Sequence, residues 1–472
     1  MKAVASRLLA AALFCSAPGA YALSLEEAIL YVIETNPQIQ AAEANKQAIE
    51  FELDQARGLY LPRVTLEGRA GPNYNDGTTT PALTSSDSVL YGYEARATIS
   101  QTIWDGNEIN SEVDRQGYRI DAAALRVLER TEFLALEAAR HYSDILRNRQ
   151  LIGLAEENLD YHRRTLEQIR SGYESGVLGI GDLQQAEERL FLAEDTLTRF
   201  TLSLADSNIL FLEVVGVEPS GLQSLPDLSA VIPTNLDAAL AAARQFNPTL
   251  RFSKADVGAA EAVYRKTRSN LYPDVLLELE GRMGENLDGY EGLERKAKAE
   301  LVIRYTFQGG IEKADRQEQL RRVSESRADM LSQARLVERE VRTTWARLQS
   351  ERRRIPILER QSASSEELLV SYEKEFEVGT RSLLDILNTQ NSLFQSKVNL
   401  VSARTVEQFG EYRLLAAIGR LVSTLNIQPP KDARPYAIQN TTAPPVNSVE
   451  DAHRSDPWTI TSPMFGNSVG LQ

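Results

Sequence analysis

Apolar and polar residues alternate with a period of two in four segments of the chain. Such alternation predicts β-strands with one apolar and one polar face. We expect strands of about nine to twelve residues, the length that a tilted strand needs to cross a bilayer. A half-buried soluble sheet would alternate in the same way, but little else in the chain could form a sandwich around these strands. The alternation runs over residues 64–70, 91–99, 275–283 and 297–307.

Two very long stretches, 107–174 and 311–377, instead repeat their apolar residues at steps of three, four and seven. This spacing predicts two helices, each about 100 Å long at 1.5 Å per residue, which no compact domain contains. Steps that average 3.5 residues are typical of a coiled coil, so we expect these helices to pack against neighbouring helices. Shorter helices are predicted over 24–58 and 235–269.

A similar turn follows each of the two long helices. Its sequence is "YESGVLGIGDLQQAE" from Tyr173 in the first case and "FEVGTRSLLDILNTQ" from Phe376 in the second. Both begin with an aromatic residue, reach a glycine after two more residues and an aspartate six residues later. Gly176 and Gly379 are expected to take the left-handed conformation that ends a helix. Helices that return from these turns are predicted over 182–214 and 382–420.

The duplicated turn is one part of a tandem repeat. Asn36-Pro37 aligns with Asn247-Pro248, "LEGRAG" with "LEGRMG", and "ISQTIWDG" with "VIRYTFQG". The chain is therefore one unit of about two hundred residues written twice, which is too long a period for a short solenoid repeat. Each unit contains a helix, two strands and a long helical hairpin. The predicted boundaries are 23–232 for the first repeat and 233–427 for the second.

One irregularity of the long helices also repeats. Pro356 in the second long helix corresponds to Gly153 in the first, at the offset that relates the two turns. Proline and glycine both weaken or bend a helix. We expect a kink or a local break at this level in both halves, with coincidence as the alternative.

The two ends of the chain differ in composition from the repeats. Residues 1–22 have a basic start, a short apolar run and a small-x-small ending, which predict a cleaved secretory signal; the apolar run is too short for a membrane anchor. Cys15, the only cysteine, lies in this segment, and lipid attachment there is an alternative that its neighbour Phe14 disfavours. Residues 428–472 are rich in proline, asparagine and threonine and predict an extended or disordered tail.

Charge and motifs exclude several classes of function. Without the two basic residues of the signal segment, 50 basic residues stand against 66 acidic ones, a net charge of about −16. This balance disfavours nucleic acid or anionic lipid as the main partner. The three histidines, His141, His162 and His453, form no metal-binding pattern, and no phosphate loop or nucleophile motif occurs. We therefore expect neither an enzyme nor a cofactor.

Four strands from one chain cannot close a barrel, and an open sheet edge in lipid leaves backbone groups unsatisfied. Several copies must then share one barrel. At this point the chain resembles the TolC family of outer-membrane channel proteins of Gram-negative bacteria. The resemblance covers residues 23–425 and rests on the tandem repeat, the two Asn-Pro pairs, "QTIWDG" and "RYTFQGG" at the strand-to-helix junctions, and the duplicated turns.

The resemblance implies a homotrimer in the outer membrane with a large periplasmic portion. Three chains would form a twelve-stranded transmembrane β-barrel in the outer-membrane lipid, continued by an α-helical coiled-coil barrel through the periplasm. A periplasmic adaptor protein and an inner-membrane ABC transporter, or alternatively an RND pump, would dock at the tip of the hairpins. Exported protein or small-molecule cargo would pass through the channel.

The resemblance also implies roles for residues at the tip. Asp385 matches the carboxylate that lines the periplasmic aperture, where three copies would form a cation-sensitive ring. Asn388 stands where a second aspartate is expected, which makes this ring less acidic. From spacing alone, an ordinary helix N-terminal carboxylate in solvent is an alternative for Asp385 and for Asp182, and both roles could hold at once.

Links between the hairpins are the second group of residues that the resemblance implies. Arg381 matches a residue that helps to hold the inner hairpin shut, and Asp182 matches an acidic partner on the neighbouring hairpin. Phe376 stands where a linking tyrosine is expected and cannot donate that hydrogen bond. Gly181 lacks a side chain at another linking position. We therefore expect closure to depend more on Arg381 than on tyrosine.

Three functions remain open at the level of the sequence. The ending "FGEYRLLAAIGRLVSTL" resembles the branch that exports large proteins such as adhesins by type I secretion. The outer component of a multidrug or metal efflux pump is the first alternative. A non-conducting periplasmic coiled-coil scaffold is the second.

Overall fold

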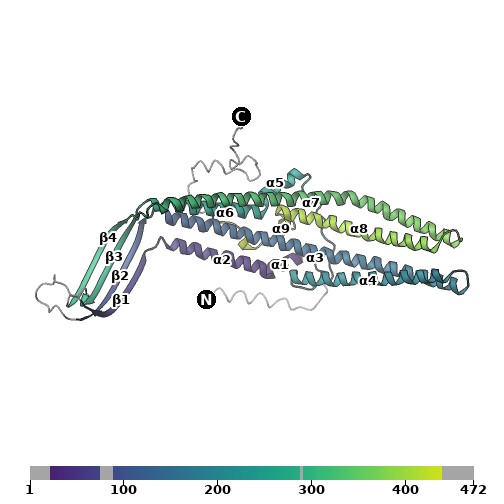
Figure 1. Ribbon diagram of the computed structural model, residues 1–472, viewed down its shortest axis with the longest axis horizontal. Coiled ribbons are helices and arrows are strands. Elements are labelled where there is room, and N and C mark those ends of the chain that lie inside the picture. The colour runs from purple at the N-terminus through teal and green to yellow at the C-terminus, as the bar shows by residue number, and fades with distance from the viewer. Residues whose placement is uncertain (1–21, 75–88, 288–290, 438–472) are drawn as a thin grey trace, which may run out of the picture. The chain divides into compact units, whose positions relative to one another are not determined.

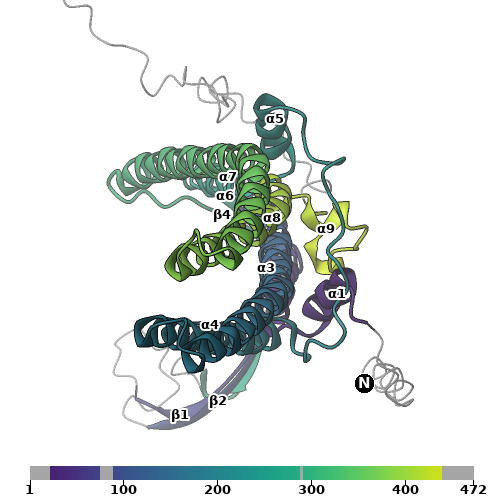
Figure 2. The ribbon, with the colours of Figure 1, turned by 90° about the vertical axis from the view of Figure 1, so that its right-hand side faces the viewer.

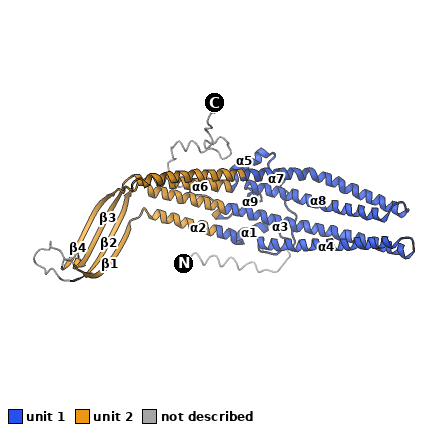
Figure 3. Ribbon diagram, in the orientation of Figure 1, with its two compact units in different colours: residues 1–42, 127–248, 336–431 blue, residues 43–126, 249–335, 432–472 orange. Residues whose placement is uncertain are grey.

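The computed structural model describes residues 22–74, 89–287 and 291–437, and the predicted signal segment lies almost wholly outside them. The described chain divides into two compact units (Figure 3). The described residues of unit 1 are 22–42, 127–248 and 336–431. Those of unit 2 are 43–74, 89–126, 249–287, 291–335 and 432–437.

Unit 2 contains a four-stranded antiparallel sheet in the order β1-β2-β3-β4 (Figure 1). All four predicted strands are confirmed, although Tyr305 and Phe307 lie beyond the end of the last strand, because regular pairing stops where Arg304 meets Asp274. β1 and β4 are the two edges of this sheet. The strands are β1 (Arg63–Asn73), β2 (Leu90–Trp104), β3 (Asp274–Glu285) and β4 (Leu293–Arg304).

The register sorts the side chains of the sheet onto two faces. One row across the four strands is apolar and consists of Leu66, Ala97, Gly281 and Ala297. The next row is charged and consists of Glu67, Arg96, Arg282 and Lys296. On the charged face, Arg282 lies 3.0 Å from Glu94. Lys298 lies 3.6 Å from Glu280 and 3.1 Å from Glu300. Alternation in the sequence thus produces an apolar face and an ion-paired face.

Two helical hairpins follow the strands, as predicted. α3 (Glu108–Glu174) and α7 (Ile311–Glu377) each contain 67 residues, and α4 (Ile180–Val215) and α8 (Leu383–Ile418) return beside them. Figure 2 looks onto the ends of the two hairpins. α4 and α8 end in the same way, at Gly216 and Gly419, which have φ values of 84° and 83°. Glycine takes this left-handed conformation without the penalty that a Cβ atom brings.

Both predicted single helices over 24–58 and 235–269 are wrong, because each is interrupted at its Asn-Pro pair. The residue before a proline is driven out of the helical region, and Asn36 has ψ 124° while Asn247 has ψ 120°. The side chains of both asparagines contact the returning helices. The side-chain amide of Asn36 donates a 3.0 Å hydrogen bond to the Val214 carbonyl, and that of Asn247 donates a 2.9 Å hydrogen bond to the Ala417 carbonyl. The observed helices are α1 (Leu25–Thr35), α2 (Pro37–Gly58), α5 (Leu236–Phe246) and α6 (Pro248–Lys266).

α3 and α7 continue without interruption through Gly153 and Pro356, so a local break at this level is wrong. Proline crowds the carbonyl of the residue four positions earlier, which here is Arg352. The Arg352 side chain ties α7 to α8 at the same point, with hydrogen bonds of 2.9 Å to Glu407 and 2.6 Å to Glu411. These bonds fix α7 against α8 about one helical turn before the proline. A kink at the two positions stays a prediction.

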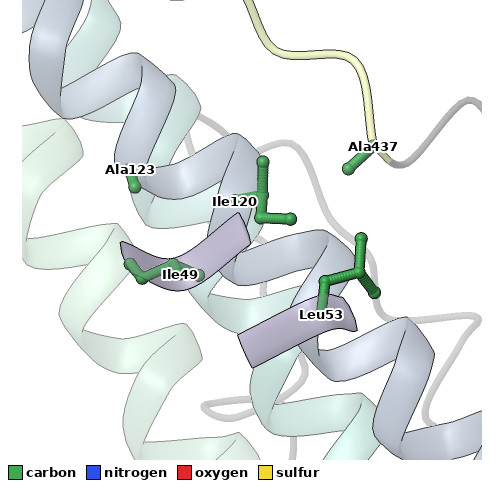
Figure 4. Packing of buried hydrophobic residues seen from close by; sticks show 5 residues of the cluster. All are labelled: Ile49, Leu53, Ile120, Ala123 and Ala437. Carbon is green, nitrogen blue, oxygen red and sulfur yellow. The ribbon is translucent and has the colours of Figure 1, made fainter. Parts of the chain in front are cut away.

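The chain after residue 427 was expected to be extended or disordered, and this is wrong for residues 428–437. A 3-10 helix, η3 (Lys431–Ala433), and the residues after it pack on α2 and α3 within unit 2. Asp121 accepts 2.8 Å hydrogen bonds from the amides of Tyr436 and Ala437. Ala437 joins an apolar cluster with Ile49, Leu53, Ile120 and Ala123 (Figure 4). The prediction for 438–472 lies outside the described residues.

Among the described helices, none combines the length and the apolar composition of a membrane span. A short helix, α9 (Leu421–Thr424), closes unit 1 after α8. Its first amides are capped from α3, where the buried Glu132 carboxylate accepts a 2.9 Å hydrogen bond from Leu421 and longer bonds from Val422.

Candidate functional site

The candidate site consists of the two duplicated turns of unit 1. In the first turn, Gly176 has φ 79° and its amide donates a 3.0 Å hydrogen bond to the Tyr173 carbonyl. In the second, Gly379 has φ 76° and its amide donates a 2.9 Å hydrogen bond to the Phe376 carbonyl. A positive φ at the same position of both turns explains the repeated glycine, since other residues are strained there.

Both aspartates of the repeated turn make hydrogen bonds with the N-cap residue of the following helix. The Asp182 carboxylate accepts a 3.1 Å hydrogen bond from the amide of Gly179, the N-cap of α4. The Asp385 carboxylate accepts a 2.8 Å hydrogen bond from the hydroxyl of Ser382, the N-cap of α8, whose oxygen accepts a 3.3 Å bond from the Asp385 amide. The carboxylate of Asp182 therefore caps its helix, whereas the cap of α8 is the Ser382 side chain, which the Asp385 carboxylate accepts from. A role for Asp385 in lining an aperture stays a prediction.

Arg381 makes its contacts within its own hairpin. Its guanidinium lies 2.7 Å from the Glu375 carboxylate and 3.9 Å from the Asp385 carboxylate. The same group lies over the ring of Tyr372, 4.0 Å from the ring centroid. The hydrogen bond to Glu375 is the main cause of a raised Arg381 pKa. Arg381 thus ties the end of α7 to the start of α8, and Glu375 and Tyr372 are partners that the sequence analysis missed.

The other predicted tip residues differ in exposure. Asn388 lies one helical turn after Asp385 on α8 and is exposed, while Asp385 is half-buried. Tyr173 is 40% exposed at the end of α3. Phe376 packs into two apolar clusters, one of which includes Leu166 and Leu387 from the two hairpins. Phe376 therefore contributes apolar packing at the tip, and its place among the linking residues stays a prediction.

Polar contacts between the two hairpins occur about one to four helical turns away from the tips. Gln390 on α8 donates a 2.9 Å hydrogen bond to Asn158 on α3, and both side chains are buried. The hydroxyl of Tyr161 on α3 donates a 2.9 Å hydrogen bond to Glu373 on α7. Sequence reasoning missed all four residues. The only local signal was the polar amides of Asn158 and Gln390 at core positions of apolar helices.

Two buried histidines lie on α3, and His162 is next to Tyr161 in the sequence. Burial is the main cause that lowers the pKa of His162, to about 4, and the charge of Arg189 lowers it further. Burial also lowers the pKa of His141. The part of the chain that the structure describes contains no group of three or more His, Cys, Asp or Glu side chains arranged to hold a metal ion.

A family model described as "Outer membrane efflux protein" matches residues 30–216 and 239–420, one block in each repeat. The chain belongs to the outer membrane efflux protein family. As a member of this family it is a protein of the outer membrane, and it acts as the channel of an export system. The family is one of channels rather than of enzymes.

Relatives of this efflux protein cover nearly the whole chain. It is 24% identical over 441 residues to the outer membrane protein TolC of Vibrio cholerae, which covers 89% of this chain and 96% of that protein. It is 21% identical over 422 residues to the outer membrane efflux protein BepC of Brucella suis, covering 89% and 90%. It is 23% identical over 426 residues to the alkaline protease secretion protein AprF of Pseudomonas aeruginosa, covering 86% of each chain.

Solved structures share the fold of this efflux protein. A membrane protein from Pseudomonas aeruginosa gives a TM-score of 0.75 at 16% identity, over 84% of this chain and 90% of that chain. The outer membrane protein VceC from Vibrio cholerae gives 0.72 at 16% identity, over 84% and 96%. The helical hairpins with four strands per chain are therefore the fold of known outer-membrane proteins.

Proposed function

We propose that this protein is the outer-membrane channel of a type I secretion system that exports large proteins such as adhesins. The observation that carries the proposal is the ending 409–425, which resembles that of protein exporters and is built into the packing of unit 1. Tyr412 donates a 2.6 Å hydrogen bond to the Pro226 carbonyl, and Arg413 pairs with Glu340 at 2.9 Å. The name of the relative AprF, a secretion protein for alkaline protease, supports the same function.

Three copies form the working channel in this proposal. The sheet has two unpaired edges, β1 and β4, and one apolar face, so a single chain leaves edge amides and carbonyls unsatisfied in lipid. Pairing of β4 with β1 of the next copy removes both edges. Three copies then give a barrel of twelve strands, and their hairpins enclose the periplasmic passage.

The tip of the hairpins is where the channel meets its partners and controls passage. A periplasmic adaptor and an inner-membrane ABC transporter dock there and deliver the cargo. Asp385 and Asn388 line the aperture, and the contacts of Arg381 with Glu375 and Tyr372 hold the second hairpin in its closed form. Opening requires these contacts to loosen, since they fix the turn between α7 and α8.

The experiment that tests this function combines a deletion with two readouts. Cells without the gene should lose export of an adhesin while keeping their resistance to drugs and metals. Loss of resistance with normal export would instead support the alternative of an efflux pump, which the name of BepC favours. In planar bilayers, the purified protein should conduct ions as a trimer. Absence of conductance would support the non-conducting scaffold.

A further inference from the structure

The apolar face of the sheet carries one basic residue. Arg295 shares its row with Met283, Ala95 and Gly68, and the rows on either side contain Ala297 and Leu293 from the same strand. Every other Lys or Arg in the four described strands lies on the ion-paired face, because its register partners belong to the alternate rows. The inference below rests on the proposed function in one respect, which is that this apolar face contacts lipid.

The position of Arg295 along the strand places it near the outer edge of the membrane. From Ile303, near the helical end of β4, to Arg295 is about 27 Å along the strand at roughly 3.4 Å per residue. A strand tilt of about 40° reduces this to about 20 Å across the membrane, close to the height of the apolar band of such barrels. Tyr91 and Tyr93 lie further out on the same face and are 75% and 50% exposed. Tyrosines in this position mark the level of the lipid headgroups.

At this level near the headgroups an arginine on the lipid face costs little, and its charge attracts the anionic groups of the headgroup layer. Most arginines of the opposite face have an anionic partner in the protein itself, for example Arg96 and Arg282, which both contact Glu94. Arg295 is exposed, and the described part of the chain offers it no ion pair. The side chains of its neighbours in the row, Met283, Ala95 and Gly68, offer no strong hydrogen-bond acceptor.

We propose that Arg295 binds the phosphate group of a lipid in the outer leaflet of the outer membrane. Its planar guanidinium donates two parallel hydrogen bonds to phosphate oxygens, a geometry that lysine does not reproduce. Ala95, Ala297 and Gly68 have small side chains, so the sheet surface beside the guanidinium is shallow. An acyl chain of the same lipid lies against this surface. Each trimer holds three such lipids, one per copy.

The acidic balance of the whole chain does not oppose this site. Charges interact through salt water over about 10 Å, so the local surface decides. The acidic residue nearest to Arg295 on this face is Glu285, one row further out and directly opposite Tyr93. At the level of Arg295 itself, the apolar face carries only the positive charge.

The test compares two arginines in adjacent rows on opposite faces. Arg295→Gln removes the proposed ligand, and Arg69→Gln, on the ion-paired face next to Gly68, is the matched control. Full-length trimers are purified in mild detergent and incubated with bisphosphorylated lipid A, with its dephosphorylated form, or with phosphatidylethanolamine. Native mass spectrometry counts the lipids that remain bound.

The wild-type protein and Arg69→Gln should retain bisphosphorylated lipid A about tenfold better than the dephosphorylated form, as expected for a charge-assisted hydrogen bond of roughly 1.4 kcal/mol or more. Arg295→Gln should lose this difference, and Arg295→Lys should keep part of it. Equal retention by Arg295→Gln and Arg69→Gln would overturn the proposal. So would full displacement by inorganic phosphate at concentrations equal to the lipid, because the acyl chain would then contribute nothing.

Conductance in planar bilayers separates this inference from the proposed function. Arg295→Gln should conduct like the wild type, since Arg295 lies on the face away from the passage. A conducting channel without phosphate-dependent lipid retention contradicts the lipid site alone. A protein that does not conduct but retains the phosphorylated lipid contradicts the channel function and leaves the lipid site supported.

Discussion

The side-chain amide of Gln390 donates a 2.9 Å hydrogen bond to the Asn158 amide oxygen across the contact between α8 and α3. The two side chains are only 7% and 8% exposed. A buried polar group that loses its partner costs about 1–3 kcal/mol. The pair therefore selects one alignment of the two hairpins, in which both amides are satisfied.

Removing one member of this pair should loosen the contact between the hairpins. Asn158→Leu and Gln390→Leu each leave an amide buried without its partner, so each should destabilise the contact by about 1–3 kcal/mol. The double variant should recover part of this loss, because neither polar group remains. Hydrogen exchange of the amides in 383–393 measures the effect. Gln395→Leu, at an exposed position of α8, is the control, and single variants that exchange no faster than this control would contradict the prediction.

Arg381 should control the resting state of the tip. Arg381→Leu removes the ion pair with Glu375 and the contact with the Tyr372 ring. These exposed contacts are individually weak, but they fix the turn, so the variant should spend more time in open, higher-conductance states. Single-channel recording in planar bilayers measures this change.

The matched control for Arg381 is Arg170, which pairs across the first hairpin with Glu187 at 3.6 Å. Arg170→Leu removes a similar exposed ion pair outside the turn between α7 and α8. If Arg381→Leu changes the open time no more than Arg170→Leu does, the tip is not held by Arg381.

Asp385 and Asn388 give opposite predictions for ion selectivity. In the proposed trimer, Asp385→Asn removes three negative charges from the aperture and should lower the preference for cations. Asn388→Asp adds three charges one helical turn away and should raise it. Reversal potentials in a salt gradient measure both shifts. Shifts of the same sign, or none, would show that α8 does not line the aperture with this face.

The long elements could be predicted from the sequence because their periods differ. Four strands with a period of two and two long helices with steps averaging 3.5 were visible in the residue pattern, and the duplicated glycines located the turns at Gly176 and Gly379. The breaks at Asn36 and Asn247 were missed because the apolar period continues across them. The effect of proline on the preceding residue was the physical signal that was overlooked.

The contacts of the candidate site were less predictable, because they join residues that only the fold brings together. Asn158 and Gln390 are far apart in the sequence, and nothing local links them. Glu375 lies six residues before Arg381, and only the reversal of the chain at Gly379 brings the two together. The ordered packing of residues 428–437 was missed for the same reason. It depends on hydrogen bonds to Asp121, and these residues show no hydrophobic periodicity that would have predicted it.

Glu132 should make the stability of unit 1 depend on pH. Burial is the main cause that raises its pKa to about 8, although the amides of Leu421 and Val422 oppose this shift. The ordinary pKa is 4.5, so between this value and about 8 the folded protein holds a proton that the unfolded chain releases. Stability must therefore fall as the pH rises across this range.

The measurement for Glu132 is the difference in unfolding temperature between wild type and Glu132→Gln from pH 5 to pH 8.5. Glutamine keeps an acceptor for the two amides and does not titrate, so the decline with pH should be weaker in the variant. The buried histidines contribute the opposite slope, below their ordinary pKa, in both proteins and cancel in the difference. The exposed Glu157 on the same helix is the control. Parallel curves for wild type and Glu132→Gln would contradict a raised pKa.

The segment 432–437 should fasten α2 to α3 in unit 2. Asp432 lies 2.7 Å from Lys46 on α2, and Asp121 on α3 accepts the amides of Tyr436 and Ala437 at 2.8 Å. Asp121→Leu leaves both amides without this acceptor, which should cost about 1–3 kcal/mol and release the segment. Faster hydrogen exchange at 436–437 and along α2 measures the release.

The control for Asp121 is Asp54→Leu on α2, whose carboxylate is 68% exposed and pairs only with Arg57 at 3.5 Å among the described residues. This variant removes an acidic residue from the same unit without freeing a buried amide. If the segment 432–437 holds α2 through Asp121, hydrogen exchange of the α2 amides becomes faster in Asp121→Leu and stays at the wild-type rate in Asp54→Leu. Protection of α2 that persists in Asp121→Leu would mean that the apolar cluster of Ile49, Leu53 and Ile120 holds the two helices without the segment.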